Sequence, residues 1–158
     1  MVVLHPPLLK YETIAEYKNH FEKHYLRSEI FTFDGIRVYF KPQKFGHAFY
    51  ESSNYTKGAK DQFSYTRAER MDWIKLTLES PNAEQFIGWN KDTKSYEKTR
   101  RVSVVYANFV VVIEIRLAKD NILKGNFVTC YVADASIEKI RKSPKWNKDD
   151  CIRELQKK

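Results

Sequence analysis

Apolar residues recur at helical spacing in two segments in the first half of the chain. In the first segment they are Ile14, Tyr17, Phe21 and Tyr25. A capping box formed by Thr13 and Glu16 predicts where this helix begins. A second capping box at residues 66–69 predicts another helix, which ends at the Ser80–Pro81 pair.

Alternating apolar and polar residues predict strands, most of them in the second half of the chain. Residues 36–40 form one predicted strand, and residues 46–50 form a short extended segment. Four further strands are predicted over residues 84–90, 95–105, 108–117 and 126–134. The connections between these four are short, which favours an antiparallel meander.

These elements predict an α+β fold of one domain, in which N-terminal helices pack on a four- to five-stranded antiparallel sheet. Residues 1–30 form an N-terminal helical arm. Ser136 and Asn147 are predicted caps of two short helices, so that residues 136–158 form a basic helical tail. The face of the sheet away from the helices is then either covered by this tail or open.

The net charge indicates a polyanionic partner. Lys and Arg total 28 against 20 Asp and Glu, which gives a formal charge of +8. Cations bind nucleic acid because neutralising phosphates releases their counterions. An open, basic sheet face is therefore a natural platform for RNA, although a basic surface without a partner is the alternative.

Several classes of site lack their sequence signature. Cys130 and Cys151 are too few for a disulfide framework or a zinc site. His20 and His24 lie four apart but without the glutamate of the zinc-protease pattern. Phosphate-binding glycine loops and a converging acidic cluster for two metal ions are also missing. We therefore expect neither a metal nor a cofactor.

Hydropathy also bears on the compartment. No apolar run approaches the ~20 residues that a membrane helix needs. The N-terminal segment lacks the basic lead-in and apolar stretch of a secretory signal. We expect a cytoplasmic protein that does not associate with membranes.

The candidate acid–base and phosphate-binding groups are His47, Arg67 and Arg70. A histidine titrates near neutrality and can move the proton that phosphodiester cleavage requires, although a single histidine is more often only a polar residue. Arg67 and Arg70 stand at the predicted start of a helix, where backbone N–H groups favour an anion. Because basic residues there oppose the helix dipole, we interpret the pair as phosphate-binding rather than as a solvated first turn.

The predicted strand over residues 126–134 adds a hydroxyl group and an aromatic ring. Alternation places Phe127, Thr129 and Tyr131 on one face and the intervening apolar residues on the other. Thr and Tyr are also ordinary strand residues, so a purely structural role is the alternative. Five further cations are predicted to bind nucleic acid: Lys44, Lys57, Lys98, Arg100 and Arg101.

The segment from residue 46 to 131 resembles the phage-associated nucleases of the barnase–EndoU–colicin–RelE-like group. The resemblance lies in the order and spacing of GH at residues 46–47, TRAERMDWI at 66–74, LESP at 78–81, the strand at Tyr96, NFVVVI at 108–113 and FVTCY at 127–131. The basic, proline-ended residues 139–144 follow in the same way. The resemblance implies metal-independent cleavage of RNA, in toxin or phage-conflict settings. It also implies an active site of His47, one of Arg67 and Arg70, and Thr129.

The leading hypothesis is therefore an endoribonuclease that uses the RNA 2′-hydroxyl as its nucleophile. His47 would be its general acid or base, and Arg70, with Arg67 or Arg101 assisting, would stabilise the phosphorane. Thr129 would bind a phosphate oxygen, and Tyr131 would stack on a base or position the phosphate. A toxin of this kind would need an inhibitor or antitoxin protein, acidic to match the charge. The alternatives are a non-catalytic RNA- or DNA-binding module and a phage-encoded accessory protein.

Overall fold

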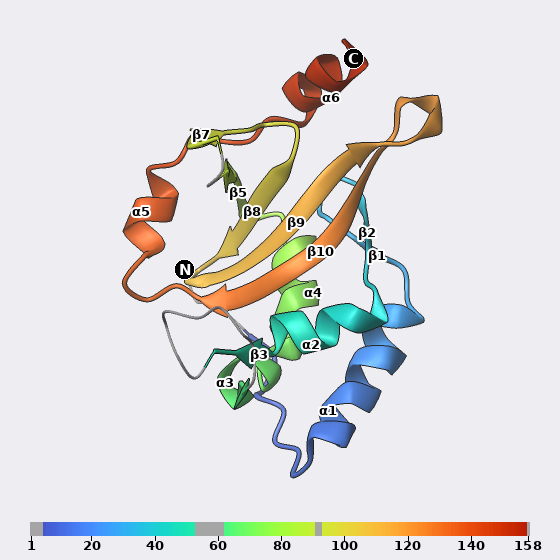
Figure 1. Cartoon of the computed structure of the whole chain (residues 1–158), viewed down its shortest axis with the longest axis vertical. Coiled ribbons are helices and arrows are strands. Elements are labelled where there is room, and N and C mark those ends of the chain that lie inside the picture. Colours follow the sequence, from blue (N-terminus) through green and yellow to red (C-terminus); the bar gives the residue numbers. More distant parts are fainter. Residues whose placement is uncertain (1–4, 53–61, 91–92, 158) are drawn as a thin grey trace.

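The computed structural model describes residues 5–52, 62–90 and 93–157, and it confirms the α+β class. Its centre is a six-stranded sheet with the strand order β1-β2-β10-β9-β8-β5 (Figure 1). The strands are β1 (Ile30–Phe31), β2 (Arg37–Tyr39), β5 (Glu84–Ile87), β8 (Arg101–Tyr106), β9 (Phe109–Leu117) and β10 (Leu123–Val132).

The prediction of a four- to five-stranded, wholly antiparallel sheet is wrong. The sheet is mixed, because β2 pairs with β10 in parallel while the other pairs are antiparallel. This pairing places Val38 directly opposite Gly125, which lies 87 positions further along the chain. Such a contact between distant parts of the chain has no local signature in the sequence.

Most helices lie on one face of the sheet (Figure 1). They are α1 (Ile14–Phe21), α2 (Phe45–Ala48), α3 (Tyr65–Ala68), α4 (Met71–Glu79) and α6 (Lys148–Gln156). The predicted capping box of Thr13 and Glu16 is confirmed. From α1 the chain continues into a π-helical turn, Glu22–Leu26, which keeps Tyr25 in the buried stripe.

The predicted extended segment over residues 46–50 is wrong, because most of it lies in the short helix α2. Phe45, Ala48 and Phe49 stand at the spacing of one helical face, and all three are buried. A 3-10 turn, Pro42–Lys44, leads into this helix. Burial of the rings of Phe45 and Phe49 thus favours the helical conformation. The segment is too short for a helical period of apolar residues to be recognised in the sequence.

The second capping box is wrong as well. Ser64 is the N-cap of α3, and its hydroxyl accepts a hydrogen bond from the N–H of Arg67 (3.3 Å). The chain leaves the helical conformation at Arg70, which stands at the N-cap position of α4. Arg67 is therefore in the last turn of one short helix, and Arg70 is at the start of the next. As predicted, α4 ends before Pro81.

Gly88 divides the predicted strand over residues 84–90. Its backbone N–H donates to the carbonyl of Arg101 (2.9 Å), and the chain then leaves the sheet. The departing segment forms a separate hairpin of β6 (Trp89–Asn90) and β7 (Ser95–Tyr96). The predicted strand over residues 95–105 is divided for the same reason, into β7 and β8.

The two faces of β10 are set by a β-bulge between Phe127 and Thr129. Before the bulge, Phe127 faces the helices, and after it Cys130 faces them. The predicted grouping of Phe127 with Thr129 and Tyr131 is therefore wrong, because the extra residue inverts the alternation once. On β9, which has no bulge, the predicted apolar stripe that begins at Phe109 is confirmed.

The opposite face of the sheet is only partly covered. The helix α5 (Ile137–Arg141) lies over one end, where Ile137 and Ile140 pack on Phe86 and Val110. It is held there by Glu84 of β5, which pairs with Lys145 (2.9 Å) and Arg141. The hydrogen bond from Lys145 is the main reason that the pKa of Glu84 lies below its ordinary value. We call the uncovered remainder of this surface the open face.

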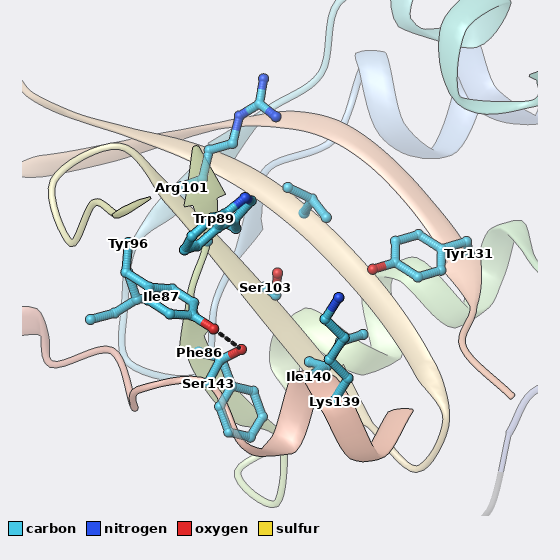
Figure 2. Close-up of a pocket in the computed structure, with 12 residues that line it drawn as sticks. Phe86, Ile87, Trp89, Tyr96, Arg101, Ser103, Tyr131, Lys139, Ile140 and Ser143 are labelled. Carbon is cyan, nitrogen blue, oxygen red and sulfur yellow. Dashed lines mark hydrogen bonds between the residues drawn. The ribbon is translucent and has the colours of Figure 1, made fainter. Parts of the chain in front are cut away.

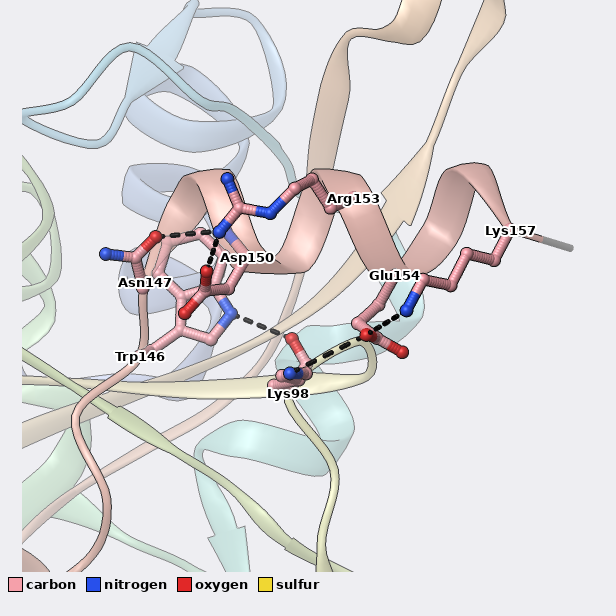
Figure 3. A network of polar contacts seen from close by, with 7 residues as sticks. All are labelled: Lys98, Trp146, Asn147, Asp150, Arg153, Glu154 and Lys157. Atoms are coloured by element: carbon pink, nitrogen blue, oxygen red, sulfur yellow. Dashed lines mark hydrogen bonds and ion pairs between the residues drawn. The ribbon is translucent and has the colours of Figure 1, made fainter.

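The segment predicted as a basic tail is part of the fold. Asn147 caps α6 as predicted, and Cys151 at the centre of that helix is buried in the core. Several positive groups of the segment are paired: Arg153 with Asp150, and Lys157 with Glu154 (3.0 Å) (Figure 3). Within the described ranges, no helix is long and apolar enough to cross a lipid bilayer.

The packing at Gly88 leads to a stability prediction. A Cβ at this position would lie 2.6 Å from the Cβ of Arg101, so Gly88→Ala forces β5 and β8 apart. We expect it to lower the free energy of unfolding by about 1–3 kcal/mol. Gly46→Ala is the matched control, because no atom lies within 4 Å and alanine favours helix α2. It should raise stability by up to about 1 kcal/mol. Urea denaturation measures both, and equal stability of the two variants would contradict the prediction.

Candidate active site

One edge of β10 is free of strand pairing over half of its length. The strand β2 pairs with β10 only at residues 124–126. From Phe127 to Val132, no strand of the described residues pairs with that edge, and α2 and α3 lie against β10 instead (Figure 1). Loop and helix residues can therefore reach the open face around this edge.

Thr129 and Tyr131 of β10 face away from the helical core, as predicted. They stand opposite Val112 and Val110 of β9. The Oγ1 atom of Thr129 is buried and has no hydrogen-bond partner. A buried polar atom without a partner costs about 1–3 kcal/mol, so its retention requires an explanation. A ligand that accepts or donates a hydrogen bond at this position is one.

Arg67 reaches this edge from α3. Its Nη1 atom donates to the carbonyl oxygen of Ala48 at 3.4 Å. Burial raises the pKa of Tyr131, and the positive charge of Arg67 acts in the opposite direction because it favours the tyrosinate. No carboxylate of the described residues pairs with this guanidinium. Arg67 is therefore a positive group close to Tyr131 that is able to receive an anion.

His47 lies in the last turn of α2 and is exposed. It directly precedes Ala48, whose carbonyl oxygen receives the hydrogen bond from Arg67. The structure thus brings the backbone of His47, the guanidinium of Arg67 and the face with Tyr131 to the same part of the molecule. These three positions are distant in the sequence, and α2 and α3 join them by packing against β10.

Arg70 lies in a different environment from Arg67. Its guanidinium packs on the ring of Trp73 (5.0 Å from Cζ to the ring centroid) and donates to the carbonyl of Thr66 (2.8 Å). Its charge also lowers the pKa of His5, second to burial. No contact within the described ranges links Arg70 to Thr129 or Tyr131. The structure supports Arg67 as the arginine of the candidate site and gives Arg70 a place at the junction of two helices.

A pocket of about 540 Å³ opens beside Tyr131, between α5, the β6–β7 hairpin and the open face (Figure 2). The hydroxyl group of Tyr131 and the ammonium group of Lys139 point into it. On the opposite side, Trp89 and Tyr96 are 49% and 44% exposed, with ring centroids 5.0 Å apart. The pocket thus combines exposed aromatic rings with a cation and a hydroxyl group.

The predicted nucleic-acid-binding cations are divided between two regions. Arg101 lines the pocket beside Tyr131 and pairs with Glu114 at 3.0 Å. Lys44 lines a smaller pocket of about 110 Å³ at the bulge of β10. Lys98 points towards α6, where it lies 3.8 Å from Glu154, and Arg100 is exposed in the adjoining turn (Figure 3). Lys57 lies outside the described residues.

The pocket is also lined by four residues that were not predicted as site residues: Trp89, Tyr96, Ser103 and Lys139. Trp89 and Tyr96 are directly opposite each other in the β6–β7 pair. The available signal was a pair of aromatic residues placed symmetrically about the short connection between the predicted strands over residues 84–90 and 95–105. Lys139 had none, because only the return of α5 across the sheet brings it to the pocket.

No protein-family model, curated protein or solved structure matches the chain. In the described parts of the chain, no three His, Cys, Asp or Glu side chains are grouped as metal ligands.

The position of Arg67 leads to a prediction about Tyr131. Removing the positive charge in Arg67→Met should raise the pKa of Tyr131 further, because only the effect of burial remains. Arg70→Met removes the same charge at a site that does not act on Tyr131. NMR titration of protein labelled at the tyrosine Cζ atoms measures both. An unchanged Tyr131 titration in Arg67→Met would show that Arg67 is not part of this site.

Proposed function

We propose that the protein is a metal-independent endoribonuclease, of the toxin or phage-conflict kind, with its active site at the free edge of β10. One observation supports this most strongly. Arg67 contacts the residue next to His47 and acts on the pKa of Tyr131, which lies two residues from the unpartnered hydroxyl of Thr129. The backbone next to His47, the guanidinium of Arg67 and two hydroxyl groups of β10 are thereby associated with one edge of the sheet.

The proposed reaction is an intramolecular transesterification of RNA. The 2′-oxygen attacks the adjacent phosphorus, the bond from phosphorus to the 5′-oxygen breaks, and a 2′,3′-cyclic phosphate and a 5′-hydroxyl form. One proton leaves the 2′-hydroxyl and one is delivered to the 5′-oxygen. His47 is the proposed carrier of one of these protons.

Charge develops on the non-bridging oxygens of the phosphorane, and a preorganised cation stabilises it. We assign this role to Arg67 rather than Arg70, since Arg67 acts on Tyr131 and Arg70 is occupied with Trp73 and Thr66. The Oγ1 atom of Thr129 would hydrogen-bond a phosphate oxygen. Tyr131, whose hydroxyl group faces the pocket, would position the same phosphate.

The pocket beside Tyr131 supports single-stranded RNA as the substrate. Exposed aromatic rings such as Trp89 and Tyr96 stack on unpaired bases, whose flat faces are not available within a duplex. Lys139 adds positive charge at the same place, and the guanidinium of Arg101, paired with Glu114, also lines it. Such a substrate would place the activity in the cytoplasm, and a cell that makes it would need an acidic inhibitor or antitoxin protein.

The second candidate function is an RNA-binding module without catalysis. It is favoured by the aromatic and basic lining of the pocket, which is sufficient to bind RNA without an acid–base group. The two functions differ in what they require of His47.

Replacement of His47 distinguishes the two functions. For a ribonuclease, His47→Ala should reduce the cleavage of single-stranded RNA in the presence of EDTA by about 10²–10⁴-fold and leave RNA affinity nearly unchanged. His24→Ala is the control, because His24 is also exposed but lies in the π-helical turn after α1. Cleavage that EDTA abolishes in the wild-type protein, or that survives His47→Ala, would rule out the proposed mechanism.

The hydroxyl of Thr129 allows a test that separates activity from folding. Thr129→Val keeps the shape of the side chain and removes a buried atom that has no partner, so stability should rise by about 1 kcal/mol. Cleavage should nevertheless fall by about 10–100-fold, as expected for losing a hydrogen bond to a charged group. Thr77→Val in α4 removes an equally unpartnered hydroxyl and should raise stability without changing cleavage. If both variants cleave RNA equally well, Thr129 has no part in the reaction.

A further inference from the structure

Three positive side chains lie next to one another on the open face, at the end of β10 far from Tyr131. Arg116 of β9 stands directly opposite Lys124 of β10, and Lys124 stands directly opposite Arg37 of β2. Their strand neighbours Val38, Ile115 and Leu123 are buried on the helix side. The three cations therefore share the face away from the core.

This arrangement is unfavourable for the isolated protein. Like charges directly opposite each other on neighbouring strands destabilise a sheet. Within the described residues, the single carboxylate paired with the three is Glu29, which lies 3.7 Å from Arg37 and is 70% exposed. The Nε atom of Arg37 is moreover buried without a hydrogen-bond partner. A bound polyanion would compensate both the repulsion and the missing hydrogen bond.

Aromatic rings are interleaved with these cations. The Cζ atom of Arg37 lies 4.8 Å from the ring centroid of Tyr39 and 5.8 Å from that of Phe31. The Nζ atom of Lys124 lies 5.5 Å from the ring of Tyr39. Phe31 is 40% exposed. Cations alternating with rings suit a ligand that presents both phosphates and flat bases.

We propose that Arg116, Lys124, Arg37, Tyr39 and Phe31 form a cationic strip that binds the backbone of single-stranded RNA at a distance from the cleaved bond. Cleavage of the RNA rests on the proposed function, whereas binding of RNA by the strip does not. Lys124 and Tyr131 are seven positions apart on β10, which corresponds to roughly 20 Å. The pocket of Lys44 and Lys41 lies between them and includes Tyr39 in its lining. Two further lysines, together with the carboxylate of Glu114, thus lie between the strip and the edge with Thr129.

The strip makes substrate length a determinant of affinity. An RNA must span roughly 20 Å to occupy both the strip and the site at Tyr131. A dinucleotide can occupy only one of them, so the protein should select oligonucleotides of several residues over dinucleotides.

Charge reversal at Lys124 tests the strip. We expect Lys124→Glu to weaken the binding of an unstructured oligouridine of about ten nucleotides by about tenfold or more. The plot of log affinity against log salt concentration should become less steep, by roughly 0.7, which is the value for one lost phosphate contact on a single strand. The uridine dinucleotide can bind at the site beside Tyr131 instead, so it should lose much less affinity than the oligouridine. Anisotropy measurements in a His47→Ala background keep the RNA intact.

Lys75→Glu on α4 is the control charge reversal, since Lys75 is exposed and lies on the opposite side of the sheet. Lys124→Glu places a negative charge between two arginines, so its stability to urea should rise or stay unchanged. Equal losses in the two variants, or an equal loss for the dinucleotide, would overturn the strip. The proposal would also be overturned if polyglutamate bound as tightly as the oligouridine, because the ligand would then be an acidic protein. If the wild-type protein cleaves no RNA while Lys124→Glu alone loses affinity, the ribonuclease proposal fails and the strip stands.

Discussion

The extra residue in β10 is the constraint on which the arrangement of the site depends. In a regular strand, alternate side chains share a face. If such a strand buried Leu123 and Phe127 on the helix side, it would also turn Thr129 and Tyr131 to that side. The bulge between Phe127 and Thr129 inverts the alternation once, so that Cys130 enters the core and the two hydroxyl-bearing side chains face outward. The aromatic packing of Phe127 on Phe40 (4.8 Å between centroids) holds this point of the strand against the helical layer.

Helices α2 and α3 act together with the bulge. Because β2 pairs with only three residues of β10, the second half of that strand is left for the two short helices to contact. Phe45, Ala48 and Phe49 anchor α2 by burial, and Ser64 fixes the start of α3. The result is that His47 and Arg67 come from the helical side of the sheet and lie at its edge. The pocket and the cationic strip are on the open face. Buried residues thereby set the positions of these two candidate site residues.

Local patterns predicted the local features correctly. The capping box at Thr13, the cap at Asn147 and the apolar stripe of β9 depend on residues within one or two turns or along one strand. Sequence also indicated that Thr129 and Tyr131 share a face, which holds because both follow the bulge. The errors arose where distant segments decide the outcome: the parallel pairing of β2, the helix at Phe45 and the burial of α6. Arg67 and Arg70 looked equivalent in sequence, and only the break between α3 and α4 gives them different surroundings.

The parallel pairing of β2 with β10 has a consequence for synthesis on the ribosome. Residues 37–39 can pair in the sheet only after residues 124–126 have been synthesised. The helix α6, which contributes Cys151 to the core, is synthesised later still. Contacts of such large sequence separation form slowly and late. A nascent chain would already present His47 and Arg67, but the strand bearing Thr129 and Tyr131 would not yet be seated. The surface that we propose for RNA would therefore be complete only near the end of translation.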